Sequence, residues 1–95
     1  MTQAERLKLD LRTAWTRKLC LWWDHFNQEY LFRALQRPVI RLGGGEATLG
    51  SWDGTRRVLT ISDRHVERDA WLQVMETLRH EMAHQYVDEI LEVND

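Results

Sequence analysis

The segment from Trp71 to Leu91 constrains the fold most, because its apolar residues follow the period of an α-helix on two sides. One stripe consists of Trp71, Val74, Met75, Leu78, Met82 and Tyr86. The second stripe consists of Ala83, Val87 and Leu91. A surface helix has one apolar face, so the pattern predicts a helix over residues 69–91, with Asp69 as its N-cap and with its second half buried between layers.

Two histidines, His80 and His84, lie four residues apart in this segment, and Glu81 follows the first. That spacing places both imidazoles on one helix face, about 6 Å apart along the axis. Imidazoles so placed can bind one zinc ion through ring nitrogens at about 2.0–2.1 Å. Glu81 points to a neighbouring face and can reach the attacking water without binding the metal. The pattern predicts a zinc hydrolase site with His80 and His84 as ligands and Glu81 as general base.

The same spacing also has an interpretation without a metal. Histidines at positions i and i+4 with a glutamate between them can occur on a solvated helix face. The second apolar stripe favours the zinc site, because buried polar side chains need partners and one ion would serve both histidines.

The composition is that of one small globular domain: 95 residues, of which 43% are hydrophobic and 29% charged. A net charge of −2 gives no electrostatic argument for nucleic acid. The single cysteine, Cys20, cannot form an internal disulfide and is expected in the core. We see neither a signal peptide nor a membrane span, so a cytoplasmic location without a membrane partner is expected. The oligomeric state is not indicated.

A long helix is expected at the start of the chain. Thr2 and Glu5 have the spacing of a capping box, and neither Gly nor Pro follows until after Leu35. Apolar residues at steps of four or seven mark one face of this helix, namely Leu7, Leu11, Trp15, Trp22, Phe26 and Tyr30. Pro38 ends the helical stretch, which we expect to span residues 2–36.

Residues 38–62 are expected to form a small, three-stranded, mainly antiparallel sheet. Its first strand would be residues 39–42, and two further strands, residues 47–52 and 57–61, would flank an Asp-Gly turn at Asp53. Gly50 within the second of these indicates a bulge or a close backbone approach. The predicted fold is therefore α+β in a single domain over residues 1–95, with a long helix, a sheet and a metal-binding helix.

The third zinc ligand is not evident from the sequence. A catalytic zinc usually has three protein ligands and a water molecule. Asp88 is two turns after His80, and about 12 Å of helix rise separates them, too far to share one ion. His25, expected to be exposed, His65, expected in an exposed loop, and a partner chain are alternatives. We expect instead that the third ligand lies in sequence beyond Asp95.

Three segments together carry a resemblance to a known family. They are Phe26-Asn27 with Tyr30, Phe32 and Leu35, followed by Pro38; Val58-Leu59-Thr60-Ile61-Ser62; and Leu78-Arg79-His80-Glu81-Met82-Ala83-His84-Gln85-Tyr86. In this order they resemble the SprT-like domain, the Spartan-type zinc metalloproteases. The resemblance covers residues 19–90. The His-Glu-x-x-His element alone is shared by many metallopeptidases, and the Phe-Asn…Tyr segment makes the likeness more specific.

The resemblance implies that His80 and His84 bind zinc and that Glu81 is the general base of peptide-bond hydrolysis. The family's third histidine follows the metal-binding helix in a His-Gly pair, which this chain lacks, so we expect a truncated form of a longer protein. The resemblance also implies a protein or peptide substrate and makes DNA a candidate partner. The alternatives are a non-catalytic zinc-binding or interaction module and an inactive fragment of such a protease.

Overall fold

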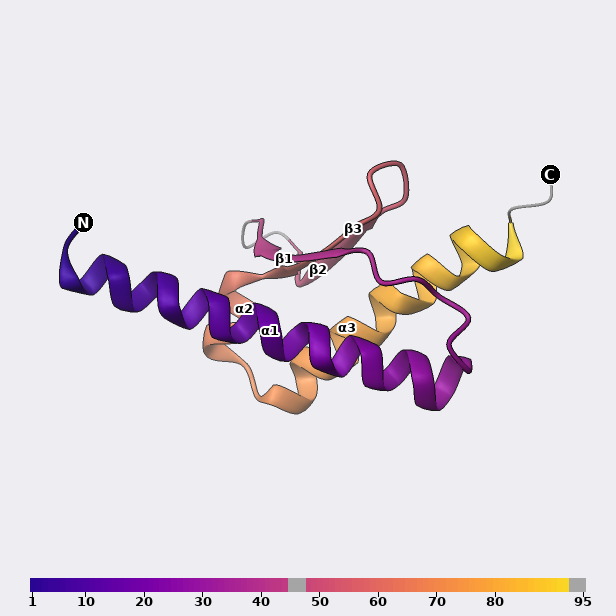
Figure 1. The fold of residues 1–95 in the computed structure, drawn as a ribbon, viewed down its shortest axis with the longest axis horizontal. Coiled ribbons are helices and arrows are strands. Elements are labelled where there is room, and N and C mark those ends of the chain that lie inside the picture. Colours follow the sequence, from indigo (N-terminus) through magenta and orange to yellow (C-terminus); the bar gives the residue numbers. More distant parts are fainter. Residues whose placement is uncertain (45–47, 93–95) are drawn as a thin grey trace.

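The computed structural model describes residues 1–44 and 48–92 (Figure 1). The helices are α1 (Gln3–Leu31), α2 (Asp63–Arg68) and α3 (Trp71–Tyr86), and a π-helical turn, η1 (Val87–Leu91), continues α3. The strands are β1 (Val39–Gly43), β2 (Gly50–Asp53) and β3 (Val58–Ser62). The predicted α+β fold, with a long first helix, a three-stranded sheet and C-terminal helices, is confirmed.

Helix α1 begins where the sequence predicts. The Thr2 hydroxyl oxygen accepts a hydrogen bond from the Glu5 backbone N–H at 3.1 Å, which pairs one of the amides that a helix start leaves free. No helix among the described residues is long and apolar enough to cross a membrane.

Helix α1 ends at Leu31, earlier than the predicted residue 36. Phe32 and Arg33 have φ angles of 52° and 63°, in the left-handed region. The chain then turns back because the Asn27 side chain donates to the Leu35 carbonyl at 2.8 Å and accepts from the Leu35 N–H at 3.1 Å. A left-handed helix end usually contains Gly, and its absence here concealed the end from the sequence.

The sheet is mixed, with strand order β1-β3-β2. Strand β2 pairs with β3 antiparallel through the predicted hairpin, in which the Asp53 carboxylate accepts from the N–H groups of Thr55 and Arg56. Strand β1 pairs with β3 in parallel, so the sheet is less antiparallel than predicted. The hairpin occupies one edge of β3, and β1 therefore adds to the other. The predicted second strand began at Ala47, which lies outside the described residues; β2 begins at Gly50.

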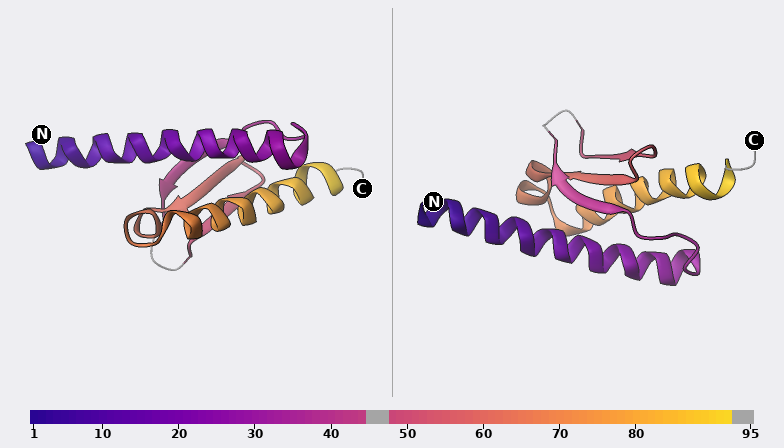
Figure 2. Two further views of the ribbon diagram at one scale, coloured as in Figure 1. Left: turned by 90° about the horizontal axis from the view of Figure 1, so that it is seen from below. Right: turned by 45° about the horizontal axis from the view of Figure 1, so that its top comes forward.

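Helices α1 and α3 cover the same face of the sheet (Figure 2). Alternating residues of β1 and β3 point toward the helices and are buried in the core between sheet and helices. Most of their neighbours along each strand are more exposed. The buried apolar residues of α1, β1, β3 and α3 are Leu19, Trp23, Phe26, Ile40, Leu42, Leu59, Ile61, Val74, Met75, Leu78 and Met82. Arg12 fixes α1 across this core, because its guanidinium pairs with Asp63 at 2.7 Å and donates to the Leu42 carbonyl.

The Asn27 amide yields a test of how α1 ends. Replacing Asn27 with Ala leaves the N–H and C=O of Leu35, a residue that is 5% exposed, without their partners. We expect the free energy of unfolding to fall by about 2–4 kcal/mol, measured by urea denaturation. Gln28→Ala, on the exposed side of the same helix, is the control and should change it by less than about 0.5 kcal/mol. Equal stability of the two variants would contradict this role of Asn27.

Candidate functional site

His80 and His84 lie side by side on the exposed side of α3. Their Nε2 atoms are 3.2 Å apart, and the two rings are nearly perpendicular. Two nitrogen ligands on a tetrahedral zinc, each at about 2.0–2.1 Å, are about 3.3 Å from one another. The two imidazoles thus have the separation that a shared zinc ion requires. Two ring nitrogens at this distance can also share a hydrogen, so the separation fits a metal without requiring one.

The prediction that the second half of this helix is buried between layers is wrong. Ala83 is exposed, and Val87 and Leu91 are 39% and 63% exposed. The buried residues of this half are instead Glu81, Met82 and Gln85, because the helix runs past the end of the sheet and only one of its sides meets another layer. The histidines are therefore accessible from solvent.

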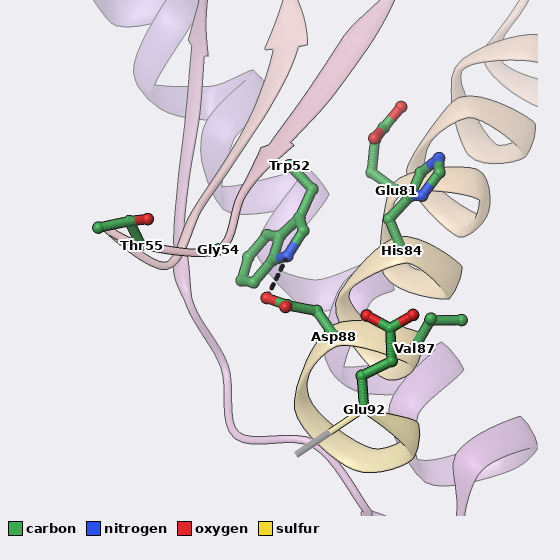
Figure 3. Close-up of a pocket in the computed structure, with 8 residues that line it drawn as sticks. All are labelled: Trp52, Gly54, Thr55, Glu81, His84, Val87, Asp88 and Glu92. Carbon is green, nitrogen blue, oxygen red and sulfur yellow. Dashed lines mark hydrogen bonds between the residues drawn. The ribbon is translucent and has the colours of Figure 1, made fainter. Parts of the chain in front are cut away.

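Glu81 is the unusual group of the site. It is 7% exposed, yet its carboxylate makes no hydrogen bond or ion pair with any residue in the described ranges. Its carboxylate oxygens are not among the buried side-chain atoms without a partner in the described residues, so they are open to solvent while the rest of the side chain is covered. A carboxylate in this position can meet water or a ligand in the pockets that Glu81 lines. Figure 3 shows its side chain directed into a groove that the His84 ring also faces.

The groove lies between the hairpin β2–β3 and α3, and Glu81 lines it on both sides. One part, of about 630 Å³, is bounded by Trp52 and Gly54 of the hairpin and by Asp88 near the end of the helix (Figure 3). The other part, of about 420 Å³, is bounded by Leu49, Gly50, Glu76, Thr77 and His80. Glu81 lines both parts of the groove, His84 lines the first and His80 the second, so a molecule bound along the groove would contact all three residues.

Strand β2 approaches α3 most closely at Gly50. A Cβ atom at this position would lie 2.9 Å from Thr77 Cγ2 and 3.2 Å from Glu81 Cγ. Of the two sequence-based interpretations of Gly50, the close backbone approach is the correct one. Strand β2 is at the edge of the three-stranded sheet, so its outer backbone groups pair with no other described strand.

No third ligand joins the histidine pair. Within residues 1–44 and 48–92, no three His, Cys, Asp or Glu side chains are grouped so that they could hold a metal ion. His25 is exposed on α1 and packs against the rings of Trp22 and Phe26. Asp88, which the sequence argument excluded, accepts a hydrogen bond from Trp52 Nε1 at 3.2 Å.

His65 is also not a candidate ligand, and its expected position in an exposed loop is wrong. It lies in the short helix α2 and is 3% exposed. Its Nδ1 bonds to the Asp69 carboxylate and its Nε2 lies 2.7 Å from the Thr77 hydroxyl, so both ring nitrogens have partners. Asp69 therefore does not cap α3; Ala70 is the N-cap, and Gln73 Oε1 accepts from its N–H.

A polar cluster that the sequence did not reveal holds the end of α3 in place. Arg57, at the hairpin, donates to both carboxylate oxygens of Glu89 at 2.7 and 3.0 Å. Gln85, which is fully buried, donates to the same carboxylate and to the carbonyl of Gln36. The Arg57 hydrogen bonds lower the pKa of the Glu89 carboxyl group. These partners lie far apart in the sequence, so no local pattern could have indicated them.

No protein family, curated protein or solved structure matches this chain.

The histidine separation yields a test of metal binding. We expect the chain to bind one zinc ion, and His80→Ala and His84→Ala each to abolish that binding, because neither ring alone provides a pair of ligands. Zinc content after dialysis and titration calorimetry measure this. His25→Ala is the control, since this exposed ring is part of a separate aromatic cluster. A wild-type chain that binds no zinc, or equal loss in the control, would contradict the site.

The Arg57–Glu89 pair predicts a pH dependence of stability. Because the folded-state pKa of Glu89 is lowered, the pair stabilises the fold above the unfolded-state pKa, about 4.3, and loses this effect as the pH falls through the lower folded-state value. Glu89→Gln should therefore reduce the urea midpoint at pH 7, and the difference from wild type should shrink in acid. Glu76→Gln, an exposed position, is the control. A difference that is constant between pH 7 and pH 3 would disprove the linkage.

Proposed function

We propose that this chain is a zinc-dependent peptidase domain, with His80 and His84 as zinc ligands and Glu81 as the general base. The proposal rests on the combination of two imidazole nitrogens 3.2 Å apart with Glu81 on the same turn of α3, a largely covered side chain whose carboxylate binds no other described residue. The resemblance to the SprT-like domain, which rests in part on the same segment, implies the same roles for these three residues.

The chemistry follows from these positions. Zinc held by the two histidines would polarise the scissile carbonyl and lower the pKa of the attacking water. Glu81 takes a proton from that water and delivers it to the leaving amine. A carboxylate without a hydrogen-bond partner is suited to this task, because no bond within the described part of the protein must break before it accepts the proton.

Strand β2 is suited to hold the substrate. An extended peptide can add to a free sheet edge through main-chain hydrogen bonds, which are largely independent of side-chain identity. The edge of β2 borders the groove, and Gly50 of this strand is in contact with Glu81. A protein or peptide bound there would pass the hydrolytic residues, so we propose unfolded or extended polypeptide segments as substrates.

DNA is retained only as a candidate partner that the resemblance implies. Arg37 pairs with Asp24, and Arg57 pairs with Glu89, so two arginines that could bind phosphate are already neutralised. The net charge of −2 adds no attraction for nucleic acid. A cytoplasmic location likewise remains a proposal based on the sequence.

A non-catalytic zinc-binding or interaction module is the second candidate function. It is favoured by one observation, the lack of a third metal-binding side chain near the histidines in the described part of the chain. A structural zinc site has four protein ligands and no need of a general base. Determination of the ligand set of the zinc-loaded protein by X-ray absorption therefore separates the two functions, since a closed four-ligand site would favour the module.

Glu81 provides the test of the catalytic proposal. Glu81→Gln should keep zinc binding, because Glu81 is not a ligand, and should lower the rate of peptide hydrolysis by about 10²–10⁴-fold. The assay is cleavage of an unfolded protein by the zinc-loaded chain. Glu67→Gln, an exposed position on α2 outside the groove, is the control and should cleave normally. Undiminished cleavage by Glu81→Gln would exclude the mechanism, and an inactive wild type would favour the non-catalytic module.

A further inference from the structure

A hydrogen-bonded series of three polar side chains, Asp69, His65 and Thr77, connects α2 to the groove, and His65 in its middle is buried. The Asp69 carboxylate can only accept a hydrogen bond, so His65 Nδ1 carries the hydrogen of their bond. In the neutral ring, Nε2 is then an acceptor, and the Thr77 hydroxyl donates to it at 2.7 Å. The same hydroxyl oxygen lies 3.2 Å from the Gln73 carbonyl. Because the hydroxyl has one hydrogen and Nε2 is nearer, His65 determines where the hydroxyl points.

The position of the Thr77 hydroxyl oxygen, set by rotation about the Cα–Cβ bond, also decides the position of the methyl group. His65 Nε2 and the Gln73 carbonyl both lie within hydrogen-bond distance of this oxygen in the same rotamer, so together they hold it there. Thr in a helix populates two rotamers, because its hydroxyl can bond to the carbonyl of the preceding turn. In the rotamer bonded to His65, Thr77 Cγ2 lies against Gly50, 2.9 Å from where a Cβ would be. In the other rotamer the methyl would leave this contact. A Cβ at Gly50 would also lie 3.2 Å from Cγ of Glu81, one turn later on α3.

We propose that Asp69, His65 and Thr77 form a positioning chain that holds strand β2 against α3 beside Glu81. None of the three needs to touch the substrate; they act through Gly50, whose backbone belongs to the edge to which a peptide would add. By fixing the position of β2, these three residues would determine where the scissile bond of a bound peptide lies relative to Glu81. The catalytic part of this inference rests on the proposed function, whereas the placement of β2 does not.

Two matched pairs of variants separate positioning from stability. Thr77→Ser keeps the hydroxyl and its bond to His65 but removes the methyl, whereas Thr77→Val keeps a methyl against Gly50 and removes the hydroxyl. Asp69→Ala removes the acceptor that orients His65, whereas Asp69→Asn retains an oxygen acceptor. The Asp69 side chain is 40% exposed, so its replacement leaves the core intact. Glu67→Ala, exposed on α2, is the control.

The first measurement uses the zinc-free protein and does not depend on hydrolysis. We expect the NMR amide signals of Gly50 and Ser51 to shift in Thr77→Ser and Asp69→Ala, and to stay near their wild-type positions in Thr77→Val, Asp69→Asn and Glu67→Ala. Thr77→Ser should keep a Tm close to that of wild type, while Thr77→Val should have a lower Tm, because His65 Nε2 loses its partner. Unchanged Gly50 and Ser51 signals in both Thr77→Ser and Asp69→Ala would overturn the proposal.

The second measurement uses zinc-loaded protein and peptide hydrolysis. Thr77→Ser and Asp69→Ala should lower kcat by about tenfold or more, since small displacements of a reacting group are costly, with little change in KM, because the main-chain pairing to β2 persists. Asp69→Asn should restore kcat. If kcat instead followed Tm across the variants, these residues would have a structural role only. If wild type does not hydrolyse peptides, the proposed function fails. The NMR result alone then decides whether Asp69, His65 and Thr77 position β2.

Discussion

The contact of Gly50 with α3 is the constraint on which the site depends. A sheet edge and a helix normally stay apart by the thickness of their side chains, but here the strand has no side chain at the point of contact. The backbone of β2 can therefore lie directly against the side chains of Thr77 and Glu81. This closeness covers most of the Glu81 side chain while leaving both histidines exposed on the same helix, so that a largely buried glutamate and two accessible imidazoles occur within one turn.

The rest of the fold maintains this contact from several directions. Helix α1 packs on the same face of the sheet as α3, and the Arg12 side chain ties it to β1 and α2. At the other end, the Arg57–Glu89 pair joins the hairpin to η1. The hairpin that carries β2 is thus held at two places. At its start, Gly50 packs against α3, and after its turn Arg57 pairs with Glu89. Such a frame is required if the groove is to keep its width when a peptide adds to the edge.

The proposed zinc site and the edge strand have different physical origins. The histidine spacing follows from helix geometry alone, and the 3.2 Å separation of the nitrogen atoms agrees with it. The groove, the largely buried glutamate and the free sheet edge are properties of the folded protein. Their coincidence at one turn of α3 makes peptide hydrolysis a more specific proposal than zinc binding by itself, although the two histidines make up only part of a zinc coordination shell.

The sequence by itself determined the order of α1, the three strands and α3, the hairpin at Asp53 and the side-by-side placement of His80 and His84, because each depends on neighbours within a helix, a strand or a tight loop. It did not reveal α2. It misplaced the end of α1, the pairing of β1, the burial of the second apolar stripe and the position of His65. Those features depend on partners far along the chain: Asn27 with Leu35, β1 with β3, and His65 with Thr77. Only the tertiary structure decided them, since a local pattern cannot show which distant group will satisfy a buried polar atom or cover an apolar face.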